Sequence, residues 1–141
     1  MGIYFNPTNE SFTQAKNSMI YVDKTELLEQ LNLRLSTENK CIAVSHARRF
    51  GKSHAAGMID AYYSLGCDSS KLFDNTKISS HADYKKYMNK YNVIHLDISS
   101  FWDFHKKDLI ESIKERVYDD FKEIYAESLN YNKDIHVLLN E

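Results

Sequence analysis

The 141-residue sequence predicts an α/β fold, a three-layer unit with a short parallel sheet and a long C-terminal helix. Cys41–Ser45 and Asn92–Ser99 are the two predicted strands, and the first lacks the polar alternation of a half-exposed strand, as is typical of parallel strands covered on both faces. A helical pattern over about Lys52–Leu65 lies between them, which favours a right-handed βαβ unit. An amphipathic pattern from about Asp103 to Leu129 predicts the long C-terminal helix.

Two short helices are expected before the first strand. The segment Pro7–Lys16 is amphipathic, with Phe12 and Ala15 on its inner face. Residues 18–23 indicate a short strand, and leucines at helical spacing predict a second helix over about residues 24–35, capped by Asp23 or Thr25. After the central helix, the pair Leu72 and Phe73 is expected to enter the core, and residues 81–90 predict a short polar helix.

Length and composition predict a single domain over residues 1–141. It would comprise N-terminal helices over 1–40, the βαβ unit over 41–100 and a C-terminal helical segment over 101–141. The net charge of −2 does not indicate nucleic-acid binding, and no apolar run approaches the length of a membrane span. Cys41 and Cys67 lack CxxC spacing and no secretory signal is visible, so we expect free thiols in a cytoplasmic protein.

The stretch between the first predicted strand and the central helix has the layout of a phosphate-binding loop. It runs Ala47-Arg48-Arg49-Phe50-Gly51-Lys52-Ser53. A strand would aim the loop, and a helix N-terminus would stand behind the anion. The complete motif has a glycine where His46 stands, so competent nucleotide binding remains an open question.

The residue types suggest a role for each member of this loop. Lys52 would reach the outer phosphates, and the Ser53 hydroxyl would hold Mg²⁺ if a nucleotide binds. Arg48 and Arg49 would clamp phosphates or an acidic partner surface, with structural ion pairs to Asp23 or Asp97 as the alternative. Asp97 itself ends a predicted strand, where we expect a structural acid rather than a catalytic one. The histidines show no metal-ligand spacing.

Three blocks of the sequence resemble the predicted AAA-ATPase-like family of bacteria and mobile elements. They are the YVDKT block at residues 21–25, the RRFGKS core at 48–53, and the Leu72-Phe73 pair with the run at 92–99. The resemblance covers roughly residues 18–100. It implies a P-loop ATPase-type fold and ATP or ADP binding, with Mg²⁺, through Arg48, Arg49, Gly51, Lys52 and Ser53.

The resemblance also has gaps. Family ATPases carry a later Walker B block with a Mg²⁺-binding Asp and a hydrolytic Glu, and nothing after Phe101 is similar to it. If 141 residues are the whole protein, we expect a truncated, non-hydrolytic P-loop NTPase-like remnant.

Two functions follow from these observations. The first is a protein-binding module, such as a phage or mobile-element inhibitor of a host defence system, with a partner that the sequence does not identify. The alternative is a domain that binds ATP or ADP at the RRFGKS loop. For the first function we expect the long C-terminal helix to be the contact face. Reversal of Asp119 and Asp120 to Lys should then leave folding intact and weaken association in a salt-dependent way.

Overall fold

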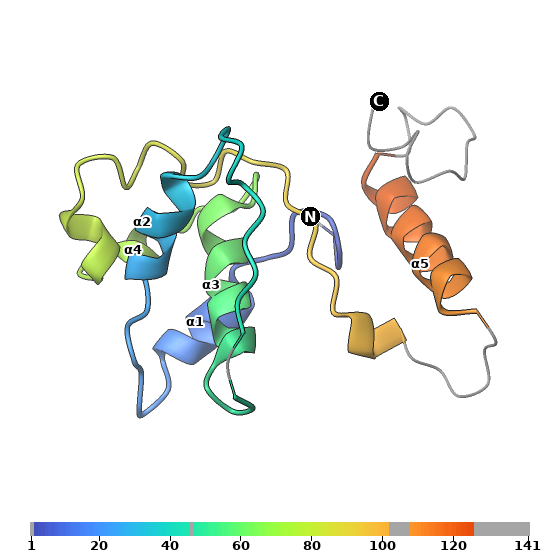
Figure 1. Cartoon of the computed structure of the whole chain (residues 1–141), viewed down its shortest axis with the longest axis horizontal. Coiled ribbons are helices and arrows are strands. Elements are labelled where there is room, and N and C mark those ends of the chain that lie inside the picture. Colours follow the sequence, from blue (N-terminus) through green and yellow to red (C-terminus); the bar gives the residue numbers. More distant parts are fainter. Residues whose placement is uncertain (1, 46, 102–107, 126–141) are drawn as a thin grey trace. The chain divides into compact units, whose positions relative to one another are not determined.

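The computed structural model describes residues 2–45, 47–101 and 108–125, and the regular elements among them are all helices or 3₁₀ turns, joined by long irregular segments (Figure 1). Among them there is no β-strand; the only β-type pairs are two isolated bridges. The predicted α/β three-layer unit with a parallel sheet is therefore wrong. The elements in chain order are α1 Glu10–Lys16, α2 Glu26–Asn32, α3 Lys52–Tyr63, α4 Ser70–Phe73, the 3₁₀ turns η1 Lys77–Ser80 and η2 Ile98–Phe101, and α5 Leu109–Ile124.

The described residues group into two compact units. One is the continuous stretch 8–92, and the other combines residues 2–7 with those described from 93 onward. The first unit contains α1 to α4 and η1, and the second contains η2 and α5. The prediction that the whole chain is a single domain stays a prediction.

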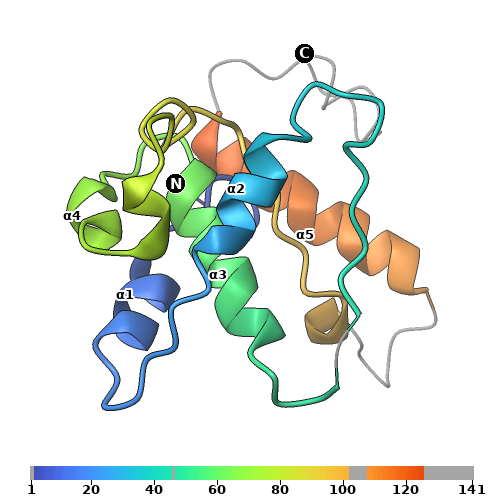
Figure 2. The same cartoon turned by 60° about the vertical axis from the view of Figure 1, so that its left-hand side comes forward.

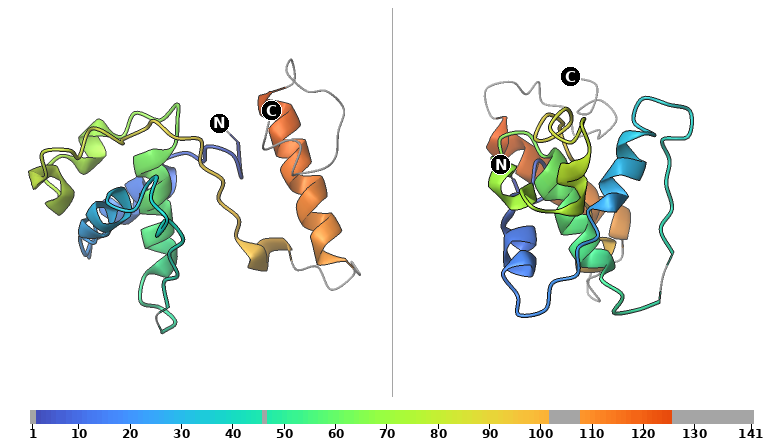
Figure 3. Two further views of the ribbon diagram at one scale, coloured as in Figure 1. Left: turned by 45° about the horizontal axis from the view of Figure 1, so that its top comes forward. Right: turned by 90° about the vertical axis from the view of Figure 1, so that its left-hand side faces the viewer.

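The two predicted strands do not form because neither gains a neighbouring strand, and they fall in different units. The segment Cys41–Ser45 belongs to no helix or strand, and its Ile42 and Val44 side chains are 43% and 63% exposed. It lies in the extended part of the chain between α2 and α3 (Figure 3). The run Asn92–Ser99 makes one isolated antiparallel bridge, between Phe5 and Ile94, and its end coils into η2.

The core of unit 8–92 is built around α3, which packs against α1 (Figure 2). Met58, Ala61 and Tyr62 are buried on α3, in agreement with a largely buried central helix, although its first turn is exposed. The ring of Phe12 stacks on that of Phe73 with centroids 5.0 Å apart, and both side chains are buried. The predicted inward positions of Phe12 and Phe73 are therefore confirmed.

The segment before α2 fastens η1 to the rest of this unit. The carboxylate of Asp23 accepts the backbone N–H groups of Thr25 and Lys77, each at 2.8 Å, and the Thr25 hydroxyl accepts the N–H of Ile78 at 3.0 Å. Burial raises the pKa of Asp23, but these N–H bonds outweigh it and leave the pKa below its ordinary value. Thr25 occupies the N-cap position of α2, as predicted, but its side chain makes no capping hydrogen bond to the helix.

Two predicted elements of unit 8–92 differ from the structure. The helix expected over 24–35 is shorter, Glu26–Asn32, because the preceding residues are committed to η1. The helix expected over 81–90 is a series of turns, in which Asn89 has a positive φ of 55°. The Asn89 side chain donates to the carbonyls of Ala61 and Ser64 and accepts the N–H of Ser69, which ties this stretch to the end of α3 by tertiary contacts.

In the second unit, the N-terminal segment of the chain is bonded to α5. The buried carboxylate of Asp120 accepts the backbone N–H groups of Ile3, Tyr4 and Phe5 at 2.7, 2.9 and 2.9 Å. The rings of Phe5 and Phe121 meet edge to face at 4.9 Å. Asp120 is thus not the exposed charge that the sequence suggested. Helix α5 was expected over residues 103–129, of which 103–107 and 126–129 lie outside the described residues.

Candidate functional site

The loop before α3 is a tight turn, and the side chain of Lys52 at its end bonds back to its beginning. The Nζ of Lys52 donates to the carbonyl of Ala47 at 2.9 Å. Arg49 and Gly51 both have positive φ, 66° and 77°, and Gly51 is the N-cap of α3. The first backbone bond within the helix joins the N–H of Ala55 to the Gly51 carbonyl at 3.0 Å. The backbone N–H groups of the first turn therefore point out of the helix towards the loop.

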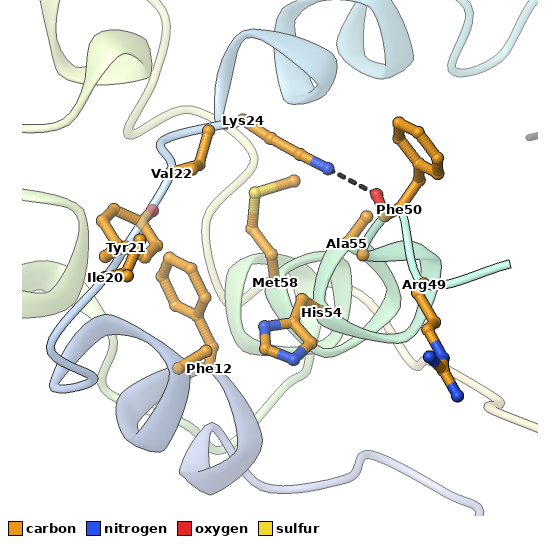
Figure 4. Close-up of a pocket in the computed structure, with 12 residues that line it drawn as sticks. Phe12, Ile20, Tyr21, Val22, Lys24, Arg49, Phe50, His54, Ala55 and Met58 are labelled. Carbon is orange, nitrogen blue, oxygen red and sulfur yellow. Dashed lines mark hydrogen bonds between the residues drawn. The ribbon is translucent and has the colours of Figure 1, made fainter. Parts of the chain in front are cut away.

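A second lysine reaches this loop from the YVDKT block. The Nζ of Lys24 donates to the carbonyl of Phe50 at 2.6 Å (Figure 4). The positive φ of Gly51, 77°, favours glycine at this position, and a Cβ placed there would lie 3.0 Å from the same Nζ, at the end of the flexible Lys24 side chain. The neighbours of Lys24 in the chain, Asp23 and Thr25, are both anchored to η1, which fixes the point from which the lysine extends.

Lys24 is the functional candidate that sequence reasoning missed. Its position inside the YVDKT block, between Asp23 and Thr25, is the sequence feature that could have identified it. The contact with the loop spans 26 positions in the chain, and no periodic pattern predicts such a contact.

Beside the loop lies a cavity of about 340 Å³ between α1, the segment before α2 and the start of α3 (Figure 4). No Asp or Glu is among the residues that line it. Its lining comprises Phe12, Ala15, Ile20, Tyr21, Val22, Lys24, Arg49, Phe50, Gly51, His54, Ala55 and Met58. Phe50 and Gly51 thus belong both to the loop and to the cavity wall.

The electrostatic character of the loop is cationic. Lys24, Arg48 and Arg49 form no ion pair with a carboxylate of residues 8–92, and the first turn of α3 contains no acidic residue. The positive end of the α3 dipole adds to these charges, and cations at a helix N-terminus are unfavourable unless an anion joins them. The alternative of an ion pair between an arginine and Asp23 is not realised, because that carboxylate bonds the backbone of Thr25 and Lys77.

The other predicted site residues have the following places. Ser53 is the second residue of α3 and is exposed, and His46 lies outside the described residues. Asp97 accepts the hydroxyl and the backbone N–H of Ser99 at 2.6 and 3.0 Å, and these bonds lower its pKa, so it shapes the start of η2. Among the described residues, no group of three or more His, Cys, Asp and Glu side chains could hold a metal ion.

Two further findings concern the expected cellular setting. Cys41 is exposed and Cys67 is half-buried, and neither forms a disulfide with a described residue. No helix among residues 2–45, 47–101 and 108–125 has the length and apolar character needed to cross a membrane.

Comparison with known proteins places the chain in a family. No curated protein and no solved structure matches the chain. The sequence profile of one family, described as predicted AAA-ATPase, matches residues 9–140. This match confirms the resemblance and extends it well beyond residues 18–100, so that α5 lies inside the family region rather than outside it. The chain therefore belongs to the predicted AAA-ATPase family.

Proposed function

We propose that the loop at residues 47–51 and the start of α3 bind the phosphate groups of ATP or ADP. One observation carries the proposal: Lys24 and Lys52 converge on a single short loop at a helix N-terminus, and neither Lys24 nor the two loop arginines pair with a carboxylate of residues 8–92. A polyphosphate would supply the missing negative charge and accept the N–H groups of the first helical turn. Family membership agrees with a nucleotide ligand, whereas the fold adds no support, because no β-sheet among the described residues precedes the loop.

The residues present fit a nucleotide phosphate by their chemistry. Gly51 has the positive φ that this turn requires, and the ammonium group of Lys52 already lies at the loop, where it donates to the Ala47 carbonyl. Arg48 and Arg49 can bind phosphate oxygens in pairs. The Ser53 hydroxyl would hold Mg²⁺, which would neutralise part of the phosphate charge when bound. Lys24 would then contact the ligand after releasing the Phe50 carbonyl.

The test compares binding of Mg-ATP and Mg-ADP to the wild-type chain and to Lys52→Ala. We expect Lys52→Ala to abolish binding, since it removes a charge from the loop. The exposed Lys71, which lies in the same unit on α4, provides the matched control: Lys71→Ala should bind as the wild type does. In thermal unfolding, ligand at 100 times its dissociation constant should add about 2.7 kcal/mol to wild-type stability. Equal affinity in the two variants would exclude the loop as the site, and no binding by the wild type would refute the proposal.

A protein-binding role is the second candidate, favoured by exposed apolar side chains. Met19, Ile20 and Val22 before α2, and Val44 before α3, are 101%, 83%, 67% and 63% exposed. Apolar surface of this kind is typical of interaction sites. Cross-linking of the purified chain in extracts of its source cells, repeated with Met19→Ser and Val44→Ser, would test it: loss of a specific partner in these variants is expected. A partner captured equally by the variants would mean that these residues are not the contact. A role as an inhibitor of host defence stays a prediction.

A further inference from the structure

The segment Cys41–Ser45 is an extended, mostly apolar stretch of chain whose backbone has no hydrogen-bond partner among the described residues. All five of its residues are exposed, and they belong to no helix or strand. In the right-hand view of Figure 3 it runs along the outside of unit 8–92, between the end of α2 and the start of α3. Its N–H and C=O groups are therefore open to pairing with another backbone.

The side chains of this segment are those of a strand. In an extended chain, residues two positions apart lie on the same face, so Ile42 and Val44 share one face. Both are β-branched, a type that is enriched in strands, and both keep much of their surface in water. The segment thus has the side chains of a strand without the neighbour that a strand needs.

Cations flank the segment at both ends. Lys40 precedes it, Arg48 and Arg49 follow it, and residues 39–59 contain no Asp or Glu. These three cations are exposed and form no ion pair with a described carboxylate. The same segment of a second copy would bring cations against cations. A strand with acidic residues at its ends would instead place opposite charges together.

We propose that Cys41–Ser45 binds an extended segment of a partner protein by strand addition, and that the partner segment has an apolar centre with acidic residues at both ends. Main-chain hydrogen bonds supply the affinity, while Ile42, Val44 and the flanking cations supply the selectivity. This inference rests on the protein-binding candidate of the proposed function, for which it specifies the chemistry of the partner.

The first experiment compares three synthetic peptides by fluorescence anisotropy. It is made without nucleotide, because Arg48 and Arg49 also belong to the proposed phosphate site. All three peptides have the same centre of alternating threonine and valine. The first carries two glutamates at each end, and the second carries two lysines there. The third is the glutamate peptide with N-methyl groups on its central amides, so that it keeps its side chains and charge but loses its hydrogen-bond donors.

We expect the glutamate peptide to bind about 5-fold more tightly than the lysine peptide, with a difference that shrinks at high salt. The methylated peptide should not bind, because strand addition depends on main-chain hydrogen bonds. Equal binding of the glutamate and methylated peptides would overturn the inference, and so would the absence of binding by all three.

Hydrogen exchange measured by NMR tests the geometry of the contact. When a strand adds to one edge, only every second residue directs its N–H group at the partner. The glutamate peptide should therefore protect either the amides of Ile42 and Val44 or those of Cys41, Ala43 and Ser45. Uniform protection of all five amides, or of none, would overturn the inference. Protection that rises with the concentration of the chain alone would identify a second copy as the occupant, and would exclude the acidic partner.

A double variant tests the apolar face. Ile42→Ser combined with Val44→Ser should weaken binding of the glutamate peptide by at least about 10-fold. Leu33→Ser is the matched control, since Leu33 is another exposed apolar residue of unit 8–92, and it should leave binding unchanged. An affinity that the double variant retains would overturn the inference. If cross-linking captures a specific partner but the glutamate peptide does not displace it, strand addition fails and the protein-binding candidate stands.

Discussion

Asp120 should be the most sensitive position of α5, because a single buried carboxylate accepts three backbone N–H groups of the N-terminal segment. Asp120→Ala removes the acceptor from Ile3, Tyr4 and Phe5 together. A buried donor without a partner costs about 1–3 kcal/mol. The donors at Ile3 and Tyr4 are part-buried and regain water, so each takes the lower figure, while the Phe5 bond is buried throughout. The sum is a loss of about 3–5 kcal/mol.

The neighbouring residue makes a matched control for this experiment. Asp119 is exposed on the same helix, and Asp119→Ala should change stability by no more than about 0.5 kcal/mol. Urea unfolding followed by circular dichroism gives the global effect, and hydrogen exchange of the Ile3 to Phe5 amides reports the second unit alone. Asp120→Asn, which keeps one carbonyl oxygen, should fall between the two. If the alanine variants at 119 and 120 agree within about 0.5 kcal/mol, the carboxylate does not hold the N-terminal segment.

Three shorter predictions concern the unit of residues 8–92 and the proposed site. Asp23→Asn should destabilise the chain at pH 7. Because the folded pKa of Asp23 is depressed, the stability that its carboxylate contributes is present above the unfolded pKa of about 3.9 and is lost as the pH falls through the folded pKa. The free energies of unfolding of wild type and variant, measured in urea, should therefore converge in acid, and a difference that stays constant with pH would contradict this. Gly51→Ala should cost about 1–2 kcal/mol in the same assay, since φ is +77°, and an unchanged stability would speak against this loop conformation. Phosphate release from Mg-ATP should stay at background, since no Walker B block is visible; turnover that Asp97→Asn removes would refute that expectation.

The helices were the part of the fold that local sequence could specify. Apolar residues recur at helical spacing in α3, and in α5 they alternate with charged residues. Each pattern by itself therefore predicts a helix. The boundaries were less predictable. Helix α2 starts at Glu26 because Asp23 and Thr25 bond residues of η1, more than fifty positions away in the chain.

The strands were wrong for a physical reason. An apolar run indicates that a segment avoids water. A strand also needs the backbone of a neighbouring strand to accept and donate its hydrogen bonds, and the sequence of the run does not show whether such a neighbour exists. Residues 41–45 and 93–98 were paired in the prediction because a helix separates them in the chain. In the structure they belong to different units, and Val44 and Ile98 keep 63% and 49% of their side-chain surface exposed.

The candidate site was predictable in its motif and not in its surroundings. The tripeptide Gly51-Lys52-Ser53 was visible because the residue types and their order suffice to suggest phosphate chemistry. Lys24 and the side of the cavity wall formed by residues 12 to 24 reach the loop only through tertiary packing, which includes that of α1 on α3.

The bonds to Asp120 have a consequence for the order of events during synthesis. They span 115 to 117 positions, so residues 3–5 are synthesised long before the carboxylate that accepts their N–H groups. The stretch 8–92 forms a compact unit to which Asp120 does not belong. Closing a loop of that length costs about 1.3 kcal/mol more in chain entropy than the 26-position closure between Lys24 and Phe50. A tag fused at the N-terminus would therefore sit on the last segment to be secured, where it would interfere with the second unit while leaving the loop and its cavity intact.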